Sequence, residues 1–308
     1  MKALNTSTGV CGRYKLRKFK KTKSGKPYDI VDTGWFDNLI TNTGLDSMLT
    51  VDNFVYEIVV GTGNSTPLVT NTSLDNLVTS KYTSQSFSGA IEYGTDLWYV
   101  TRQKYTQFPE GDAAGNLQEV GVQTATGDLV SRALIVDDLG NPTTLTVLSN
   151  EFLTVEYEFR QYPVMSDITG TIVFTGSKAG SYDYTMRLSR VHLNDGTQRP
   201  NKTENTSYSY GYSDISTLDD IYGYPTSGRI ATNNYSINNE TYVPGSFYSD
   251  ATIFFNTTIG NAPPGGINTL RFKIGNFWWQ VEFDPVIPKR DTDELTLTVR
   301  TALSRKSL

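Results

Sequence analysis

The sequence predicts an all-β protein made of two β-sandwich-like domains with long loops and only short helices. Runs that alternate polar and apolar residues recur at short spacing along the 308 residues, and clusters of Gly, Asn, Ser and Thr separate them. Only 19% of the residues are charged. Long amphipathic periods are absent, and the short helix candidates lie at 72–79 and 217–222. No apolar run reaches the roughly 18 residues that a membrane-spanning helix needs.

A basic β-hairpin is the first predicted element. Basic residues alternate with others along 13–18, and Ser24-Gly25 marks a turn before a second strand at 28–31. Lysines on such a ribbon suit an edge position, because a charged edge resists pairing with other sheets. We therefore expect an edge ribbon.

The cationic cluster on this hairpin stands out in a chain of net charge -5. It favours docking onto an acidic face of a neighbouring subunit, and contact with DNA phosphates is the alternative. Direct DNA contact is disfavoured because no aromatic stacking pattern lies among the lysines. The residues predicted to dock subunits are Arg13, Lys15, Arg17, Lys18, Lys20, Lys21 and Lys23.

A short helical turn and a buried strand follow the hairpin. Thr43 or Asp46 is expected to cap a turn that runs through Leu49, and the β-branched and aromatic residues at 54–60 predict a buried strand. The glycines of 61–63 end that strand. A phosphate-binding loop at 61–63 is disfavoured, because no helix start with a third glycine or a lysine follows.

Several short motifs follow one another along the first half of the chain. They are TGWFDNLITNTGLD at 33–46, YEIVVGTG at 56–63, STP at 65–67, TSL at 72–74, GNLQEVGV at 115–122 and LVSRA at 129–133. This order resembles that of tailed-bacteriophage virion structural proteins of the tail, collar, baseplate or fibre type. The resemblance does not extend to the second half.

The resemblance implies that the first domain is an attachment and assembly module. Within the motif at 33–46, we expect Trp35, Phe36, Leu39 and Ile40 to be buried and to hold the basic hairpin to the first sandwich. It further implies a protein of the virion that is assembled in the host cytoplasm. The N-terminus lacks the apolar core of a signal peptide, so export by that route is not expected.

The chain divides into a first domain at 1–163 and a second at 164–308. The alternating run at 151–160 closes the first domain, and a comparable run at 294–300 closes the second. This echo leaves two interpretations open, namely a duplicated sandwich or two unrelated alternating strands.

The chain has one cysteine and one histidine, and this disfavours metal sites and catalytic sites built from these residues. The single Cys11 offers one thiolate and no internal disulfide, which excludes a structural zinc site. The single His192 lies in an alternating run before an Asn-Asp-Gly turn, as a strand histidine does, and no nucleophile-elbow pattern surrounds any serine. We therefore predict no catalytic, cofactor-binding or metal-binding residue, and no cofactor.

Paired carboxylates could still serve a glycosidase without any histidine. Most lie on the polar faces of alternating strands, which is their ordinary place, and no calcium loop pattern surrounds the acidic pairs at 137–138 and 219–220. The carboxylates considered are Glu92, Asp96, Glu119, Glu156, Glu158, Asp214, Asp219, Asp220, Glu282 and Asp284.

Tyrosines crowd the loop-like region 201–250 among Asn, Ser and Gly. This mixture is typical of recognition surfaces, because tyrosine supplies contact area at low entropic cost. Packing of an ordered insertion against a neighbouring subunit is the alternative to receptor contact. The residues predicted to contact a partner or receptor are Tyr208, Tyr210, Tyr212, Tyr222, Tyr224 and Tyr235.

Together these observations predict a non-enzymatic structural component of a phage virion. Its place is the tail, collar or baseplate, or a fibre attached there, and it assembles as a homo-oligomer. A host-receptor-binding tail protein is the first alternative and a polysaccharide depolymerase the second. The expected partners are copies of itself and other virion structural proteins, with a host surface glycan or protein as a further option.

Overall fold

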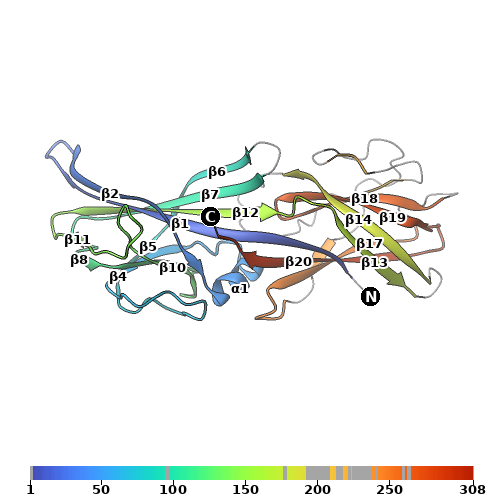
Figure 1. Cartoon of the computed structure of the whole chain (residues 1–308), viewed down its shortest axis with the longest axis horizontal. Coiled ribbons are helices and arrows are strands. Elements are labelled where there is room, and N and C mark those ends of the chain that lie inside the picture. The colour runs from blue at the N-terminus through green and yellow to red at the C-terminus, as the bar shows by residue number, and fades with distance from the viewer. Residues whose placement is uncertain are drawn as a thin grey trace. The chain divides into compact units, whose positions relative to one another are not determined.

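The computed structural model describes residues 3–93, 97–175, 179–191, 209–212, 218–220, 223, 237–239, 242–258, 261 and 265–307. In this part of the chain the fold is all-β, with several sheets and one short helix, so the predicted fold class is confirmed (Figure 1). No helix among these residues is long and apolar enough to cross a membrane.

Two compact units make up the chain. The N-terminal unit comprises Val10–Gly89, Thr101–Gln161 and Arg305–Leu308, and the C-terminal unit comprises Met1–Gly9, Ala90–Val100 and Tyr162–Ser304. The main division at Gln161 lies close to the expected one at residue 163. Unlike the expected contiguous halves, however, each unit contains segments from both ends of the chain.

The N-terminal half of the chain supplies twelve strands and the helix. They are β1 Leu4–Lys21, β2 Pro27–Asp37, β3 Leu39–Ile40, α1 Asn42–Thr50, β4 Glu57–Gly61, β5 Leu77–Tyr82, β6 Ser84–Tyr93, β7 Leu97–Phe108, β8 Gly115–Leu117, β9 Glu119–Gln123, β10 Leu129–Leu134, β11 Leu145–Val147 and β12 Phe152–Pro163. Strands β3-β10-β9-β4-β5 form a five-stranded sheet, and β11 pairs with β8.

The remaining strands follow in the second half. They are β13 Ile168–Phe174, β14 Gly180–Val191, β15 Ser209–Tyr212, β16 Ile237–Asn239, β17 Tyr248–Phe255, β18 Ile267–Ile274, β19 Phe277–Ile287 and β20 Leu295–Arg305. Strands β13-β14-β19-β18-β15 form a second five-stranded sheet. An eight-stranded sheet has the order β16-β17-β20-β1-β12-β7-β6, and β2 pairs with β1 beside this path.

The predicted helix and strand near residue 50 exist with shifted ends. Helix α1 begins earlier than expected, because its cap is Thr41, two residues before Thr43 and five before Asp46. The Thr41 side chain accepts a hydrogen bond from the Gly44 amide at 2.8 Å. The helix expected at 72–79 is wrong, since β5 occupies its end and pairs with β4. For the candidate at 217–222, the described residues 218–220 form no helix.

Burial of the 33–46 motif is confirmed only in part. Phe36 and Ile40 are buried, whereas Trp35 and Leu39 remain partly exposed. The Trp35 ring lies beneath the guanidinium of Arg13, 4.7 Å from its carbon. This indole therefore shields a cation at the surface instead of filling the core.

The C-terminal unit has an apolar core between its strands. It includes Phe272, Trp279 and Phe283, together with Ile253 and Val299 from other strands of the unit. Alternation along β19 sends neighbouring rings to opposite faces of the sheet.

Trp278 is the ring expected to point outward from β19. It is only 7% exposed, and the Arg271 guanidinium lies 4.2 Å from its ring centroid. The outward face of this strand is thus covered as well.

A buried lysine in the N-terminal unit predicts a pH-dependent stability. Lys104 on β7 is 8% exposed and donates hydrogen bonds to Asn53 Oδ1 and the Val55 carbonyl at 2.7 and 3.1 Å. Burial, with the nearby charge of Arg102, lowers the pKa of Lys104 from 10.5 to about 8. Below pH 8 the folded protein therefore holds an ammonium in an unfavourable site.

We expect the Lys104→Met variant to remove a rise in stability between about pH 8 and 10.5. In that window the unfolded chain binds the proton that the folded chain has released, so stability increases with pH. The rise should be at most about 3 kcal/mol, because each pH unit of this window adds about 1.4 kcal/mol. Urea unfolding of both proteins across this pH range measures it. Parallel pH profiles would contradict the expectation.

Candidate functional site: a buried arginine network and an exposed basic arm

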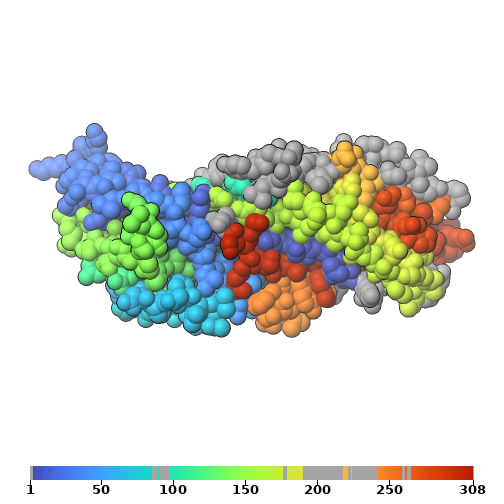
Figure 2. Space-filling view, viewed as in Figure 1, coloured from blue at the N-terminus to red at the C-terminus, as the bar shows by residue number. Residues whose placement is uncertain are grey.

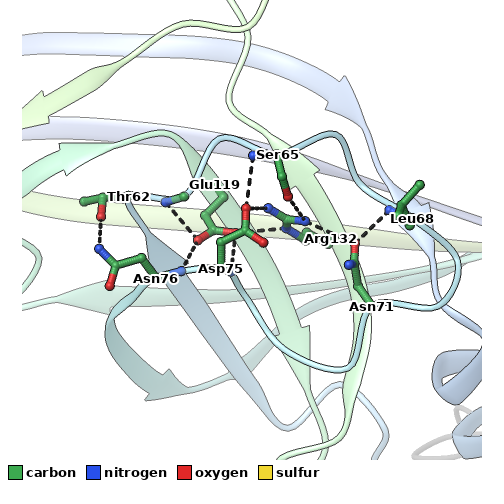
Figure 3. A network of polar contacts seen from close by, with 9 residues as sticks. Thr62, Ser65, Leu68, Asn71, Asp75, Asn76, Glu119 and Arg132 are labelled. Atoms are coloured by element: carbon green, nitrogen blue, oxygen red, sulfur yellow. Dashed lines mark hydrogen bonds and ion pairs between the residues drawn. The ribbon is translucent and has the colours of Figure 1, made fainter.

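Arg132 on β10 lies at the centre of a polar network whose inner members, Arg132 and Glu119, are fully buried (Figure 3). Its Nε donates to Glu119 Oε2 at 2.9 Å, and both side chains are 0% exposed. Its Nη2 donates to Asp75 Oδ2 at 2.5 Å. Its Nη1 donates to Ser65 Oγ at 3.2 Å and Asn71 Oδ1 at 3.1 Å. One guanidinium thus holds β9 and two parts of the loop between β4 and β5.

Glu119 completes the network by accepting from the same loop. Its Oε1 accepts from the amides of Gly63 and Asn76 at 3.0 and 2.9 Å, and its Oε2 accepts from the Asp75 amide at 3.1 Å. Close approach explains the glycine at position 61, because a Cβ there would lie 2.6 Å from both the Asn76 carbonyl oxygen and Glu119 Oε1.

Asp75 lies on the exposed side of the network, as do Ser65 and Asn76. Hydrogen bonding from Ser65, together with the charge of Arg132, holds the pKa of Asp75 below its ordinary value. Its Oδ2 accepts from the Ser65 amide at 3.0 Å, and Asn71 Oδ1 accepts from the Leu68 amide at 2.7 Å. The loop therefore uses its side chains to satisfy its own backbone.

The motifs of the first half meet in this network. In the sequence, GTG, STP, EVG and SRA are four separate motifs. In the structure, one residue of each motif takes part in a single hydrogen-bond network: Gly63, Ser65, Glu119 and Arg132. Glu119 was among the carboxylates considered for catalysis. Its charge is paired and its oxygens accept protein hydrogens, so the network acts as a structural clamp.

Exposed residues form a basic ribbon at the other candidate site. Every residue from Lys21 to Asp32 is exposed, and we call this segment the arm. The arm ends in a turn closed by hydrogen bonds between Thr22 and Lys26, with Gly25 at a φ of 82°. It projects from the rest of its unit at the upper left of the view (Figure 2).

Four of the seven predicted docking residues already pair with carboxylates of their own unit. Arg13 lies 3.0 Å from Glu158, Lys15 lies 3.4 Å from Asp32, Lys18 lies 3.3 Å from Glu151, and Lys20 lies 2.7 Å from Asp29. These pairs fasten the base of the hairpin and reduce the charge it offers to a neighbour.

The other three predicted docking residues differ in their surroundings. The Lys21 ammonium lies 4.1 Å from the Phe152 ring centroid, and Arg17 is partly buried on β1. Lys23 is exposed in the turn, as is Lys26. The outward-facing charge of the arm is therefore concentrated at Lys23 and Lys26 in its turn.

Glu158, another considered carboxylate, is likewise held in a structural role. Burial raises the pKa of Glu158, but hydrogen bonds from Gln103, Arg13 and Arg160 outweigh it and hold this pKa below its ordinary value.

The acidic pair at 137–138 lies in a turn. Asp137 Oδ1 accepts hydrogen bonds from the amides of Leu139 and Asn141, so this side chain closes its own turn. Within the described residues, no group of three potential ligands is arranged to hold a metal ion.

Glu282 and Asp284 line a groove on the C-terminal unit. The groove has a volume of about 730 Å³ and lies over β13, β14 and β19. Asp183 of β14 lies opposite Asp284 of β19 in the antiparallel register. We call it the acidic groove, with Thr169, Gly170, Thr171, Asp183, Tyr184, Thr185, Asn268, Glu282, Phe283, Asp284 and Val286 as its lining.

The tyrosines predicted to contact a partner fall in two groups. Tyr208, Tyr222, Tyr224 and Tyr235 lie outside the described residues, as does His192. Tyr210 and Tyr212 belong to β15, which pairs with β18, and only their backbone is described.

The described residues 218–220 and 223 lie against strands of their own unit. Gln280 on β19 donates from Nε2 to the carbonyls of Asp219 and Asp220, both at 3.1 Å. Ser189 on β14 donates from Oγ to the Gly223 carbonyl at 2.6 Å. At these points the tyrosine-rich region is anchored by its backbone to the sheet.

No family model, no curated protein and no solved structure matches this chain.

Proposed function

We propose that this chain is a non-enzymatic structural component of a phage virion that assembles as a homo-oligomer. Its place is the tail, collar or baseplate, or a fibre attached there. The observation that carries the proposal is the arm, an exposed ribbon of twelve consecutive residues whose base is joined to Glu158 and Glu151 by the ion pairs of Arg13 and Lys18. A ribbon that is ordered before binding loses little entropy when it docks, which suits a permanent assembly contact.

The buried network supports the same proposal. Gly63, Ser65, Glu119 and Arg132 of this network come from the motifs that resemble virion proteins, and the Glu119–Arg132 ion pair is 0% exposed. Residues that are hydrogen-bonded to one another in this way stabilise the fold of the N-terminal unit and do not present a reactive group. Symmetric virion assemblies repeat one interface many times, so a stable module with a projecting contact element is the form expected of a subunit.

Sizing and location test the proposal together. Sedimentation velocity of the purified full chain over a concentration series should show a discrete oligomer, and mass spectrometry of purified particles of the encoding phage should detect the chain. A monomer at every concentration that is also absent from particles would overturn the proposal. Release of oligosaccharides from host polysaccharide by the purified chain would overturn its non-enzymatic part.

A further inference from the structure

The outer edge of the hairpin is irregular, and this determines what kind of contact it can make. Asp29 and Gly34 on β2 have φ values of 55° and 67°, and the pairing with β1 shifts register between Lys15 and Arg17 and again between Lys18 and Lys20. Bulges of this kind twist an edge away from regular pairing. The arm is therefore built to dock through its side chains, not by adding a strand.

The side chains of the arm combine positive charge with exposed apolar surface. Its two aspartates are paired with lysines of β1, Asp29 with Lys20 at 2.7 Å and Asp32 with Lys15 at 3.4 Å. Lys23 and Lys26 keep their charge exposed in the turn, beside apolar residues that are 44–48% exposed. These apolar residues are Tyr28, Ile30 and Val31. A concave acidic surface is the partner that fits this composition.

The acidic groove has the complementary composition. Asp183, Glu282 and Asp284 line it, and none of its described lining residues is Lys or Arg. Asp183 and Asp284 lie directly opposite each other across β14 and β19, an arrangement of like charges that disfavours the free sheet. A lysine placed between them removes this repulsion.

We infer that the arm of one copy docks into the acidic groove of a second copy of this chain. The inference rests on the proposed homo-oligomer and names its contact. Lys23 and Lys26 meet Asp183 and Asp284, while the apolar residues of the arm pack at the rim. Because arm and groove are different surfaces, the contact is heterologous and generates a ring where the rotation closes, or a filament where it does not.

Charge reversal with complementation tests this contact in the full chain. The arm variant is Lys23→Glu/Lys26→Glu, and the groove variant is Asp183→Lys/Asp284→Lys. All four side chains are exposed, so both variants should fold. Each variant alone should self-associate at least about tenfold more weakly than the wild type, measured by sedimentation at physiological salt.

Mixing the two variants should restore co-assembly. The basic arm of the groove variant then meets the acidic groove of the arm variant, and the two reversed surfaces meet each other. Lys81→Glu on β5 and Glu110→Lys, which lie outside both surfaces, are the matched controls and should associate as the wild type does.

Each contrary result has its own meaning. Variants that self-associate as tightly as the wild type would overturn the arm-to-groove contact and leave the homo-oligomer standing. Two impaired variants that fail to complement each other would overturn the pairing of these surfaces. A wild type that is monomeric at every concentration would overturn the arm-to-groove contact, and its absence from particles as well would overturn the proposed function. Association that requires another virion protein would overturn a second copy as the occupant.

Discussion

Replacing Arg132 by Met is expected to lower the free energy of unfolding by about 3–5 kcal/mol, because it leaves a buried charge without its partner. Glu119 is 0% exposed, and its two oxygens are occupied by the Arg132 guanidinium and by three backbone amides. Without the guanidinium, the carboxylate must stay charged in the interior or take up a proton. Either outcome costs stability.

The loss should be localised to the loop between β4 and β5. Hydrogen exchange should show reduced protection of the amides of Gly63, Asp75 and Asn76, which donate to Glu119. Urea unfolding followed by circular dichroism gives the accompanying change in free energy.

Arg300→Met is the matched control. Arg300 also pairs with a carboxylate through two nitrogens, Nε and Nη2 to Asp250 at 2.7 Å, but its side chain is 37% exposed. An exposed pair contributes less than about 1 kcal/mol. Equal losses in the two variants would show that burial does not decide the strength of the Arg132 network.

Replacing Gly44 by Ala is expected to cost about 2–3 kcal/mol, the upper range for overpacking against backbone. A Cβ at this position would lie 2.8 Å from the Val130 carbonyl carbon and closer still to its oxygen. The same strand binds the helix start, since Thr41 Oγ1 donates to the Leu129 carbonyl at 2.5 Å. Helix α1 would have to move away from β10 to admit the methyl group.

Helix propensity predicts the opposite sign, which makes this substitution informative. In an open helix, Ala is favoured over Gly by about 1 kcal/mol. Thr43→Ala, in the same helix but partly exposed, should change stability by less than about 0.5 kcal/mol. Thermal unfolding of both variants measures the difference. A more stable Gly44→Ala protein would contradict the close packing of α1 on β10.

Local patterns predicted the elements that local chemistry controls. Alternation at 13–18 and 151–160 became β1 and β12, since a period of two places one row of side chains on each face of a strand. The helix predicted at 72–79 was wrong for a different reason. A short, weakly periodic segment takes the structure that its neighbours offer, and β4 offered hydrogen bonds to Leu77–Tyr82.

The candidate sites depended on partners that sequence spacing does not reveal. Arg132 is 57 residues from Asp75 and 13 from Glu119 in the chain, and nothing local indicates that their side chains meet. A charged residue on an alternating strand is ordinarily solvated. The polar residues of the network occur within motifs whose order resembles that of virion proteins. That order indicated a family but did not predict that these side chains contact one another.

By itself the sequence determined the all-β class, the basic hairpin with its turn, and the lack of cysteine or histidine pairs, because these follow from composition and from the period of neighbouring side chains. Tertiary structure alone decided which charged side chains form ion pairs and which stay exposed. Burial and ion pairing join residues far apart in the chain, so Glu119 and Arg132 became a clamp, Lys18 and Lys20 pair with carboxylates, and Lys23 and Lys26 stay exposed in the turn of the arm.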